Sequence, residues 1–331
     1  MKPRIVVVGS SNTDMIIRLN RLPRPGETLL GGEFSMAAGG KGANQAVAAA
    51  RAGGRVTFIA RVGTDVFGDR ALEGFRRDGI EVDRIIRDPR SASGVALIFV
   101  GAEGQNSIAV ASGANARLTA SDVRKARRVI AEADLLMMQL ETPLATVRAA
   151  AQEAAAARVS VVLNPAPARP LPPTLLRLVT VLTPNETEAE MLSGVRIRND
   201  RSAVRAAVAL LGQGPKIVAI TLGARGALVA TREGHQIVPA FPVRAVDTTA
   251  AGDVFNGALA VALAEGRELN DAVRFANAAA ALSVTRLGAQ PSAPSRSAIE
   301  RLLRLGMCPQ VGPHEDHGTR QQRNRQIQNP D

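Results

Sequence analysis

The sequence predicts an α/β fold: a doubly wound, mostly parallel sheet flanked by helices, with a small antiparallel β lid. Short apolar runs rich in β-branched residues alternate along the chain with segments of helical composition, and this alternation predicts the large sheet. Two other stretches combine polar–apolar alternation with turn residues and lack helical periodicity, which predicts the hairpins of the lid.

The first predicted strand is residues 5–9, a β-branched run of the kind that parallel sheets bury on both faces. Helical composition is found in the intervening segments, for example at residues 145–158 and 203–211. Further strands are predicted at residues 55–62, 95–100, 135–139, 159–163, 179–183 and 217–222. Because crossovers between parallel strands are right-handed, the result is a doubly wound sheet, which binds ligands at the carboxyl ends of its strands.

The predicted lid consists of residues 12–38 and 91–112, and we expect it to form part of one domain over residues 1–306. After Gly306 the sequence has almost no apolar residues and is rich in Gln, Arg and Asn. A segment of that composition cannot bury enough apolar surface to become ordered. Residues 307–331 are therefore predicted to be a disordered tail.

The composition narrows the available chemistry. The chain has 331 residues, of which 46% are apolar and 21% charged, so it can bury a large core as ordinary globular proteins do. A single cysteine, Cys308, excludes an internal disulfide and a cysteine-based zinc site. Of the three histidines, His314 and His317 lie in the predicted tail, which disfavours histidine-based metal or triad chemistry. Any catalysis is therefore expected from carboxylates and backbone groups.

Two kinds of partner are not expected, a membrane and a nucleic acid. The longest nearly apolar stretch, residues 254–264, is about half as long as a bilayer-spanning helix, and the apolar run at residues 5–8 is too short for a secretory signal. We therefore expect a cytoplasmic protein. The net charge of +11 would attract polyanions, but aromatic residues make up only 2% of the chain, without Trp or Tyr, so there is no platform on which bases could stack.

Residues 245–258 predict an anion site beside a carboxylate. A strand end leads into Ala250-Ala251-Gly252 and then to Asp253 in the first turn of an apolar helix. The backbone N–H groups of Ala251, Gly252 and Asp253 would bind the anion. Asp253 would accept a proton from a substrate hydroxyl as a phosphoryl group arrives. The alternative is that Asp253 only stabilises the N-terminus of its own helix.

A second ligand loop is predicted at Gly39-Gly40-Lys41-Gly42-Ala43-Asn44-Gln45, before an alanine-rich helix. Glycines allow the backbone to approach a ligand closely, and the helix start supplies N–H donors. The loop is not a Walker A loop, because Gly42 follows Lys41 where that motif has Ser or Thr. The alternative is a flexible turn before a packing helix.

Two further segments follow predicted strands. Asn185 and Glu188 suit a hydrated magnesium ion or the oxygens of a phosphate chain, although the same spacing is also typical of a helix-capping arrangement. Residues 221–227 form a glycine-rich turn along which a nucleotide could lie. Each of these signals is weak when taken alone.

In this order and spacing the segments resemble the ribokinase family of carbohydrate kinases. The resemblance extends from residue 5 to about residue 305. It is carried by Gly9-Ser10, Asn12-x-Asp14, Pro25-Gly26-Glu27-Thr28, Gly39-Gly40-Lys41-Gly42-Ala43-Asn44-Gln45-Ala46, Gly94-Val95-Ala96, Gln139-Leu140-Glu141, Asn164-Pro165-Ala166-Pro167-Ala168, Thr183-Pro184-Asn185-Glu186-Thr187-Glu188, Asp247-Thr248 with Ala250-Ala251-Gly252-Asp253, and Gly288-Ala289-Gln290-Pro291-Ser292.

The resemblance implies a kinase domain that uses ATP to phosphorylate D-ribose at its 5-hydroxyl, giving D-ribose 5-phosphate and ADP, with Asp253 as general base. The residues implied to bind the sugar are Asn12, Asp14, Gly40, Lys41, Asn44, Glu141 and Asp253. Those implied to contact the nucleotide are Asn185, Glu188, Thr221, Gly223, Gly226, Gly252 and Asn277. Glu188 would order Mg²⁺ through water, and Asn277 stands where the family often has His.

The family also uses a monovalent cation, usually K⁺, and forms a homodimer in which two lids pair. The positions that match the cation site, several of them through backbone carbonyls, are Asp247, Thr249, Ser283, Arg286, Gly288 and Ser292. Two alternatives stay open: a kinase for another small sugar such as 2-deoxyribose or for a nucleoside, and a non-catalytic regulator that senses sugar or binds nucleic acid.

Overall fold

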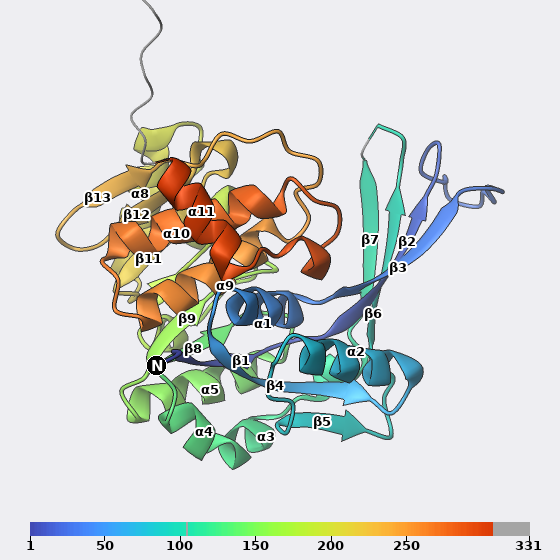
Figure 1. Ribbon diagram of the computed structural model, residues 1–331, viewed down its shortest axis with the longest axis horizontal. Helices are drawn as coiled ribbons and strands as arrows, with labels where there is room; N and C mark the ends of the chain where they lie inside the picture. The colour runs from blue at the N-terminus through green and yellow to red at the C-terminus, as the bar shows by residue number, and fades with distance from the viewer. Residues whose placement is uncertain (104, 307–331) are drawn as a thin grey trace, which may run out of the picture.

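The computed structural model describes residues 1–103 and 105–306, which form a nine-stranded sheet flanked by helices and a separate four-stranded sheet (Figure 1). The predicted tail, residues 307–331, lies outside the described residues. Within the described part of the chain, no helix combines the length and the apolar character needed to cross a bilayer.

The large sheet has the strand order β13-β12-β11-β10-β9-β8-β1-β4-β5. Neighbouring strands are parallel from β5 to β11, and β12 and β13 are added antiparallel at the other edge. The strands are β1 (Arg4–Val8), β4 (Arg55–Gly63), β5 (Ile85–Asp88), β8 (Leu135–Met138), β9 (Ser160–Leu163), β10 (Val181–Leu182), β11 (Ile217–Thr221), β12 (Ala227–Ala230) and β13 (His235–Val238). The predicted doubly wound, mostly parallel sheet is confirmed.

Helices bury both faces of this sheet, which explains why the strands are continuously apolar. Ile5 and Val7 pack into the core formed with α1, α9 and α10, whereas Val6 and Val8 pack into the core formed with α5 and α8. The helices are α1 (Lys41–Arg51), α2 (Val66–Arg77), α3 (Ala120–Lys125), α4 (Arg127–Ala131), α5 (Leu144–Ala156), α6 (Pro173–Leu176), α7 (Glu186–Ser193), α8 (Asp200–Gly212), α9 (Ala251–Ala264), α10 (Leu269–Ser283) and α11 (Arg296–Leu305).

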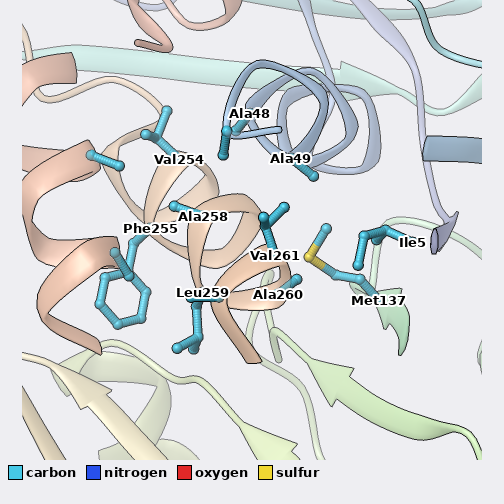
Figure 2. Packing of buried hydrophobic residues seen from close by; sticks show 14 of the residues in the cluster. Ile5, Ala48, Ala49, Met137, Val254, Phe255, Ala258, Leu259, Ala260 and Val261 are labelled. Carbon is cyan, nitrogen blue, oxygen red and sulfur yellow. The ribbon is translucent and has the colours of Figure 1, made fainter. Parts of the chain in front are cut away.

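Helices α1 and α9 pack very closely against each other. Figure 2 shows the small side chains of Ala48 and Ala49 on α1 beside α9. A Cβ atom on Gly257 of α9 would lie 2.6 Å from the Cβ of Ala48 and 2.7 Å from the backbone oxygen of Gln45. Only glycine fits there, so Gly257 sets the separation between the helix that follows the glycine loop and the helix that carries Asp253.

The four-stranded sheet, called the small sheet below, has the order β3-β2-β6-β7. Its strands are β2 (Asn12–Arg18), β3 (Glu33–Gly39), β6 (Gly94–Val100) and β7 (Asn106–Ala111). Each predicted hairpin is present as an antiparallel pair, and the two hairpins are joined by parallel pairing of β2 with β6. The apolar run at residues 95–100 therefore belongs to the small sheet and not to the large one, because it pairs directly with the next strand, β7, instead of leading into a helix.

Candidate active site

The site begins at the carboxyl end of β1. Here the strand order of the large sheet reverses, because β4 is added on one side of β1 and β8 on the other. A Cβ on Gly40, whose φ is +88°, would lie 2.7 Å from the backbone nitrogen of Asn12, and one on Gly42 would lie 2.5 Å from that of Ser10. These glycines let α1 start directly against the end of β1.

Glu141, which follows β8, stabilises the start of α1 across the sheet. Its Oε2 accepts hydrogen bonds from the Lys41 backbone N–H at 2.9 Å and from the Ser10 hydroxyl at 2.5 Å. Because α1 has no side-chain cap of its own, the carboxylate of Glu141 supplies the negative charge that favours a helix N-terminus. The predicted sugar residues Gly40, Lys41 and Glu141 are thus brought together.

Asp253 is buried at the first turn of α9, and its carboxylate is turned towards α1. Oδ2 accepts from Asn44 Nδ2 at 3.0 Å, and Oδ1 accepts from Gln45 Nε2 at 2.9 Å. The residue preceding α9, Ala250, has a left-handed φ of +58° and provides no side-chain cap. Asp253 therefore makes no capping hydrogen bond to its own helix, since both carboxylate oxygens bind amides from α1, although its charge still lies in the first turn of α9.

The turn before α9 leaves two of its amides without an acceptor among the described residues. The Ala251 N–H donates to the Thr248 carbonyl at 3.2 Å, and the Val254 N–H donates to the Ala250 carbonyl at 2.9 Å. Among the described residues, the N–H groups of Gly252 and Asp253 have no acceptor. Of the three amides predicted to bind an anion, those of Gly252 and Asp253 remain for a ligand.

A chain of buried amides that the sequence did not reveal links these helices to the sheet. Gln139, Asn164 and Thr183 directly follow β8, β9 and β10. Gln139 Nε2 donates to Gln45 Oε1 (2.6 Å), and Gln45 Nε2 donates to Asn164 Oδ1 (3.1 Å). Asn164 Nδ2 in turn donates to the Thr183 carbonyl (2.9 Å). Thr183 Oγ1 donates to Asn256 Oδ1 (2.5 Å), and Asn256 Nδ2 donates to the Gly252 carbonyl (2.8 Å). The available signal was an amide or hydroxyl directly after each buried strand.

Asn12 and Asp14 of β2 face the same region from the small sheet. Asn115, a second buried residue that the sequence did not reveal, donates from Nδ2 to Asn12 Oδ1 at 2.7 Å and also accepts from the Ser11 N–H. This fixes the Asn12 amide so that its NH₂ group is the one available to a ligand. Asn12 and Glu141 also line a cavity of about 310 Å³.

The charges of the site form one cluster. Burial, then the negative charges of Glu141 and Asp253, raise the pKa of Asp14 to about 6. The pKa of Lys41 is raised by the charge of Asp253 and further by Glu141 and Glu188, against the opposing effect of burial. The Lys41 ammonium thus lies among carboxylates from several elements, an arrangement suited to a ligand that brings both hydroxyl groups and a phosphate.

The predicted phosphate and nucleotide residues lie at the ends of β10 and β11. Asn185 and Glu188 form a reciprocal capping box at the start of α7, so the capping alternative is present there. The pKa of Glu188 is raised, mainly by burial, with Lys41 and Asp253 acting in opposite directions. Asn185 also bridges to Thr221, which joins the two segments.

Gly226 and Asn277 both lie against the end of β13. A Cβ on Gly226 would lie 2.1 Å from the Val238 carbonyl oxygen. Asn277 Nδ2 donates to the carbonyls of Val238 at 2.9 Å and Pro239 at 3.2 Å. Together with Gly223 in the turn after β11, these residues frame one edge of the sheet, and the donors of Asn277 are committed to holding the chain that leaves β13.

Two loops predicted to bind a monovalent cation are joined beside the start of α9. Asp247 Oδ1 accepts from the Thr249 N–H and hydroxyl at 2.9 and 2.6 Å, and Oδ2 accepts from the Gly288 N–H at 2.8 Å. Burial acts to raise the pKa of Asp247, but these hydrogen bonds hold that pKa below its ordinary value. The hydroxyls of Ser283 and Ser292 instead bond backbone carbonyls three residues earlier, and the Arg286 N–H donates to the Ser283 carbonyl.

Within residues 1–103 and 105–306, no three or more His, Cys, Asp or Glu side chains are grouped so as to hold a metal by themselves. A divalent ion here would need ligands from a bound phosphate chain and from water, which is how Mg²⁺ is commonly bound beside nucleotides. The buried carboxylate of Glu188 fits that indirect role.

Comparison with known proteins shows which family this chain resembles. The family model described as "pfkB family carbohydrate kinase" matches residues 2–296. A ribokinase from Haemophilus influenzae is 47% identical over 296 residues, covering 89% of this chain and 97% of that protein. A deoxyribokinase from Salmonella typhi is 38% identical over 302 residues, covering 91% of this chain and 99% of that protein.

The fold agrees with the sequence match. The structure of Arabidopsis thaliana ribokinase complexed with ribose and ATP superposes with a TM-score of 0.86 at 33% identity, covering 92% of this chain and 99% of that one. Sequence and fold give the same assignment over nearly the whole described chain. The protein belongs to the pfkB family of carbohydrate kinases.

Proposed function

We propose that this kinase transfers the γ-phosphoryl group of ATP to the 5-hydroxyl of D-ribose, giving D-ribose 5-phosphate and ADP. One observation carries the proposal: the buried Asp253 carboxylate, bound by Asn44 of the glycine loop, lies in the first turn of α9 next to the N–H groups of Gly252 and Asp253, which no described residue accepts. Further support comes from the ribokinase of H. influenzae and from the plant ribokinase structure that holds ribose and ATP.

The sugar is held between the small sheet and the glycine loop. Asp14 and the remaining oxygen of Glu141 accept hydrogen bonds from its hydroxyl groups, since Glu141 Oε2 already binds Lys41 and Ser10. Asn12, Lys41 and Asn44 serve as polar partners for the other oxygens, with Gly40 allowing the backbone to approach. The small sheet acts as the lid that excludes water, which would otherwise compete as phosphoryl acceptor.

Proton transfer and phosphoryl transfer occur at the start of α9. Asp253 accepts the proton of the 5-hydroxyl as that oxygen bonds to the γ-phosphorus, and the bond from phosphorus to the bridging oxygen of ADP breaks. The N–H groups of Gly252 and Asp253, with the positive end of α9, stabilise the charge on the transferring group. The turn formed through Ala251 shapes this anion site.

The nucleotide lies along the ends of β10, β11 and β13, next to Asn185, Thr221, Gly223 and Gly226, and Asn277 supports the chain around its base and ribose. When bound, Mg²⁺ neutralises charge on the phosphate oxygens, and Glu188 would order its water ligands. The loops of Asp247, Thr249, Ser283, Arg286, Gly288 and Ser292 would hold K⁺ through oxygen atoms.

We further propose that the protein is a cytoplasmic homodimer that pairs through the small sheet and takes neither a membrane nor a nucleic acid as partner. Support for the dimer comes from large apolar side chains that the small sheet exposes, among them Phe34, Leu97 and Ile108. The role of K⁺ would be to order the loop that builds the anion site rather than to touch the reacting atoms.

An ATP-dependent assay tests the proposal. ADP release is measured with D-ribose, 2-deoxyribose and a nucleoside as acceptors, with and without K⁺, and we expect D-ribose to give the highest kcat/KM. 2-Deoxyribose is the second candidate because a deoxyribokinase is 38% identical. A higher kcat/KM for 2-deoxyribose would make it the substrate in place of ribose. Absence of ADP release together with salt-dependent DNA retention would favour a regulator.

A further inference from the structure

Gln45 is a buried residue of α1 for which the proposed mechanism has so far no use. Its side chain has an exposed fraction of 0%, so it cannot touch a sugar or a nucleotide. Its Nε2 donates to Asp253 Oδ1 at 2.9 Å and to Asn164 Oδ1 at 3.1 Å. Its Oε1 accepts from Gln139 Nε2 at 2.6 Å. Both donors and the acceptor of this amide are therefore engaged.

The partners of Gln45 allow only one orientation of its amide. If the amide flipped, its oxygen would face the oxygens of Asp253 and Asn164. Gln139 could follow such a flip, since its Oε1 has no partner among the described residues. The two remaining mismatches in a buried position are strongly unfavourable. Donation from Gln45 to Asp253 is thus enforced by Asn164 at the carboxyl end of β9, whose own amide is fixed by its bond to the Thr183 carbonyl.

Asp253 has another donor within reach. A carboxylate at the third position of a helix commonly turns back to the backbone N–H of the N-cap residue, which in α9 is Ala250, as Glu188 does with Asn185 at the start of α7. We propose that Gln45 is a positioning residue: by holding Asp253 towards α1, it keeps the carboxylate from turning back to Ala250 and aims it at the acceptor hydroxyl. This inference rests on the proposed function of Asp253 as general base.

Asn44 and Gln45 both donate to Asp253 but differ in what else they can do. Asn44 Oδ1 is buried and has no partner among the described residues, so Asn44 can also bind the substrate. Gln45 has no such capacity left. Substitution of Gln45 should therefore change the chemical step without changing sugar binding, which separates positioning from substrate contact.

The test compares Gln45→Met and Gln45→Glu with the wild-type full-length protein in steady-state kinetics and in calorimetric ribose binding. Met keeps the length of the side chain and removes the hydrogen bonds. We expect kcat to fall about 10- to 100-fold, because a misplaced catalytic group costs on that order, while KM and the Kd for ribose stay within about threefold.

The Gln45→Glu variant provides a readout that loss of packing alone would not change. At pH 8 its introduced carboxylate faces Asp253 without a proton to donate, so kcat should be lower than that of Gln45→Met. Towards pH 6 the introduced carboxyl group takes up a proton and can again donate to Asp253. The ratio of kcat for Gln45→Glu to kcat for Gln45→Met should therefore rise as the pH is lowered.

Gln139→Met is the matched control, because it removes a buried amide from the same chain while Asn164 still holds the Gln45 amide in the orientation that donates to Asp253. We expect a similar loss of thermal stability and a kcat within about threefold of wild type. The inference is overturned if Gln45→Met keeps wild-type kcat, if Gln139→Met loses as much kcat, or if ribose affinity falls together with kcat. An inactive wild type would overturn the proposed function and this inference with it, whereas the first three outcomes leave the proposed function standing.

Discussion

At the scale of single residues, the site depends on where a carboxylate finds its donors. Asp253 stands at a helix start, where its own backbone offers N–H groups, yet both of its oxygens bind the amides of Asn44 and Gln45. The N–H groups of Gly252 and Asp253 therefore keep their hydrogen-bonding capacity although a carboxylate lies in the same turn. Burial and the negative charges of Glu141 and Asp253 raise the pKa of Asp14, and the charges of Asp253 and Glu141 raise the pKa of Lys41 against the effect of burial.

Replacing Asp253 with Asn tests the base directly. Asp253→Asn removes the proton acceptor and keeps the size of the side chain, although its NH₂ group meets an amide donor from Asn44 or Gln45. We expect a folded protein that still binds ribose in calorimetry and has lost about three powers of ten in kcat. If the variant kept more than about a tenth of the wild-type turnover, Asp253 could not be the base.

Asp14 predicts a dependence of sugar binding on pH. Its pKa is raised to about 6, and the ionised form is the one that accepts hydrogen bonds from sugar hydroxyls. We expect KM for ribose to rise about tenfold per pH unit below pH 6, whereas kcat at saturating ribose changes less. A KM that stayed flat from pH 7 to pH 5 would contradict an ionised Asp14 as sugar ligand.

The same residue predicts a gain of stability when it is neutralised. The raised pKa means that the folded chain holds this proton more tightly than the unfolded chain, so stability falls as the pH rises through about 6. Asp14→Asn should therefore raise the free energy of unfolding by up to about 3 kcal/mol at pH 8 and hardly at all below pH 4. Thermal melts at both pH values check this, and an equal shift at both would contradict it.

At the scale of elements, the spacing of α1 and α9 decides whether Asp253 can reach its partners. Gly257→Ala would place a methyl group 2.6 Å from the Cβ of Ala48 and 2.7 Å from the backbone oxygen of Gln45. We expect the helices to separate, at a cost of about 1–3 kcal/mol of stability and with a loss of kcat.

Gly74→Ala provides the matched control for this substitution. Gly74 lies inside α2, and a Cβ there would meet only the end of the Arg77 side chain, at 4.0 Å. The same change should therefore stabilise that helix by about 0.5–1 kcal/mol without affecting turnover. Melting curves and kinetics of both variants decide; wild-type kcat in Gly257→Ala would show that the helix spacing is not required.

The sequence predicted the elements that are marked by the residues of their own segment. It did not predict roles that depend on contacts between segments far apart in the chain. Residues 5–9 and 217–222 correspond closely to β1 and β11, whereas the run at residues 179–183 yields the two-residue strand β10. The glycine loop and Asp253 could be recognised because ligand chemistry restricts those positions. Gln45, Asn115 and Asn164 could not be assigned a role, because the function of a buried amide depends on partners that the chain brings together only on folding.

At the scale of the whole molecule, the small sheet has two apolar faces and little to cover them. Register places Ile98, Ile108 and Val110 on the face of Asp14, and Met36 and Leu97 on the opposite face. Antiparallel sheets that face water on one side usually alternate apolar and polar residues. Side chains on both faces nevertheless remain about half exposed, including Met36, Leu97, Ile108 and Val110.

The proposed dimer would cover these side chains with a second copy of the chain, which gives a prediction at this scale. Val110 lies on β7 with an exposed fraction of 52%, and Val208 lies on α8 with 58%. Both can be changed to Glu at a similar cost to the fold, because neither is in a core. Sedimentation and light scattering should show a dimer for wild type and Val208→Glu.

For Val110→Glu we expect a monomer, since a charge buried without a partner in an interface is strongly unfavourable. KM for ribose should rise in that variant, because a sheet that loses its cover closes less firmly over the sugar and because Val110 lines the cavity of Asn12 and Glu141. A dimeric Val110→Glu protein, or a wild-type monomer with full activity, would mean that the apolar faces of the small sheet have another purpose. A monomer with unchanged KM would separate dimer formation from the closing of the site.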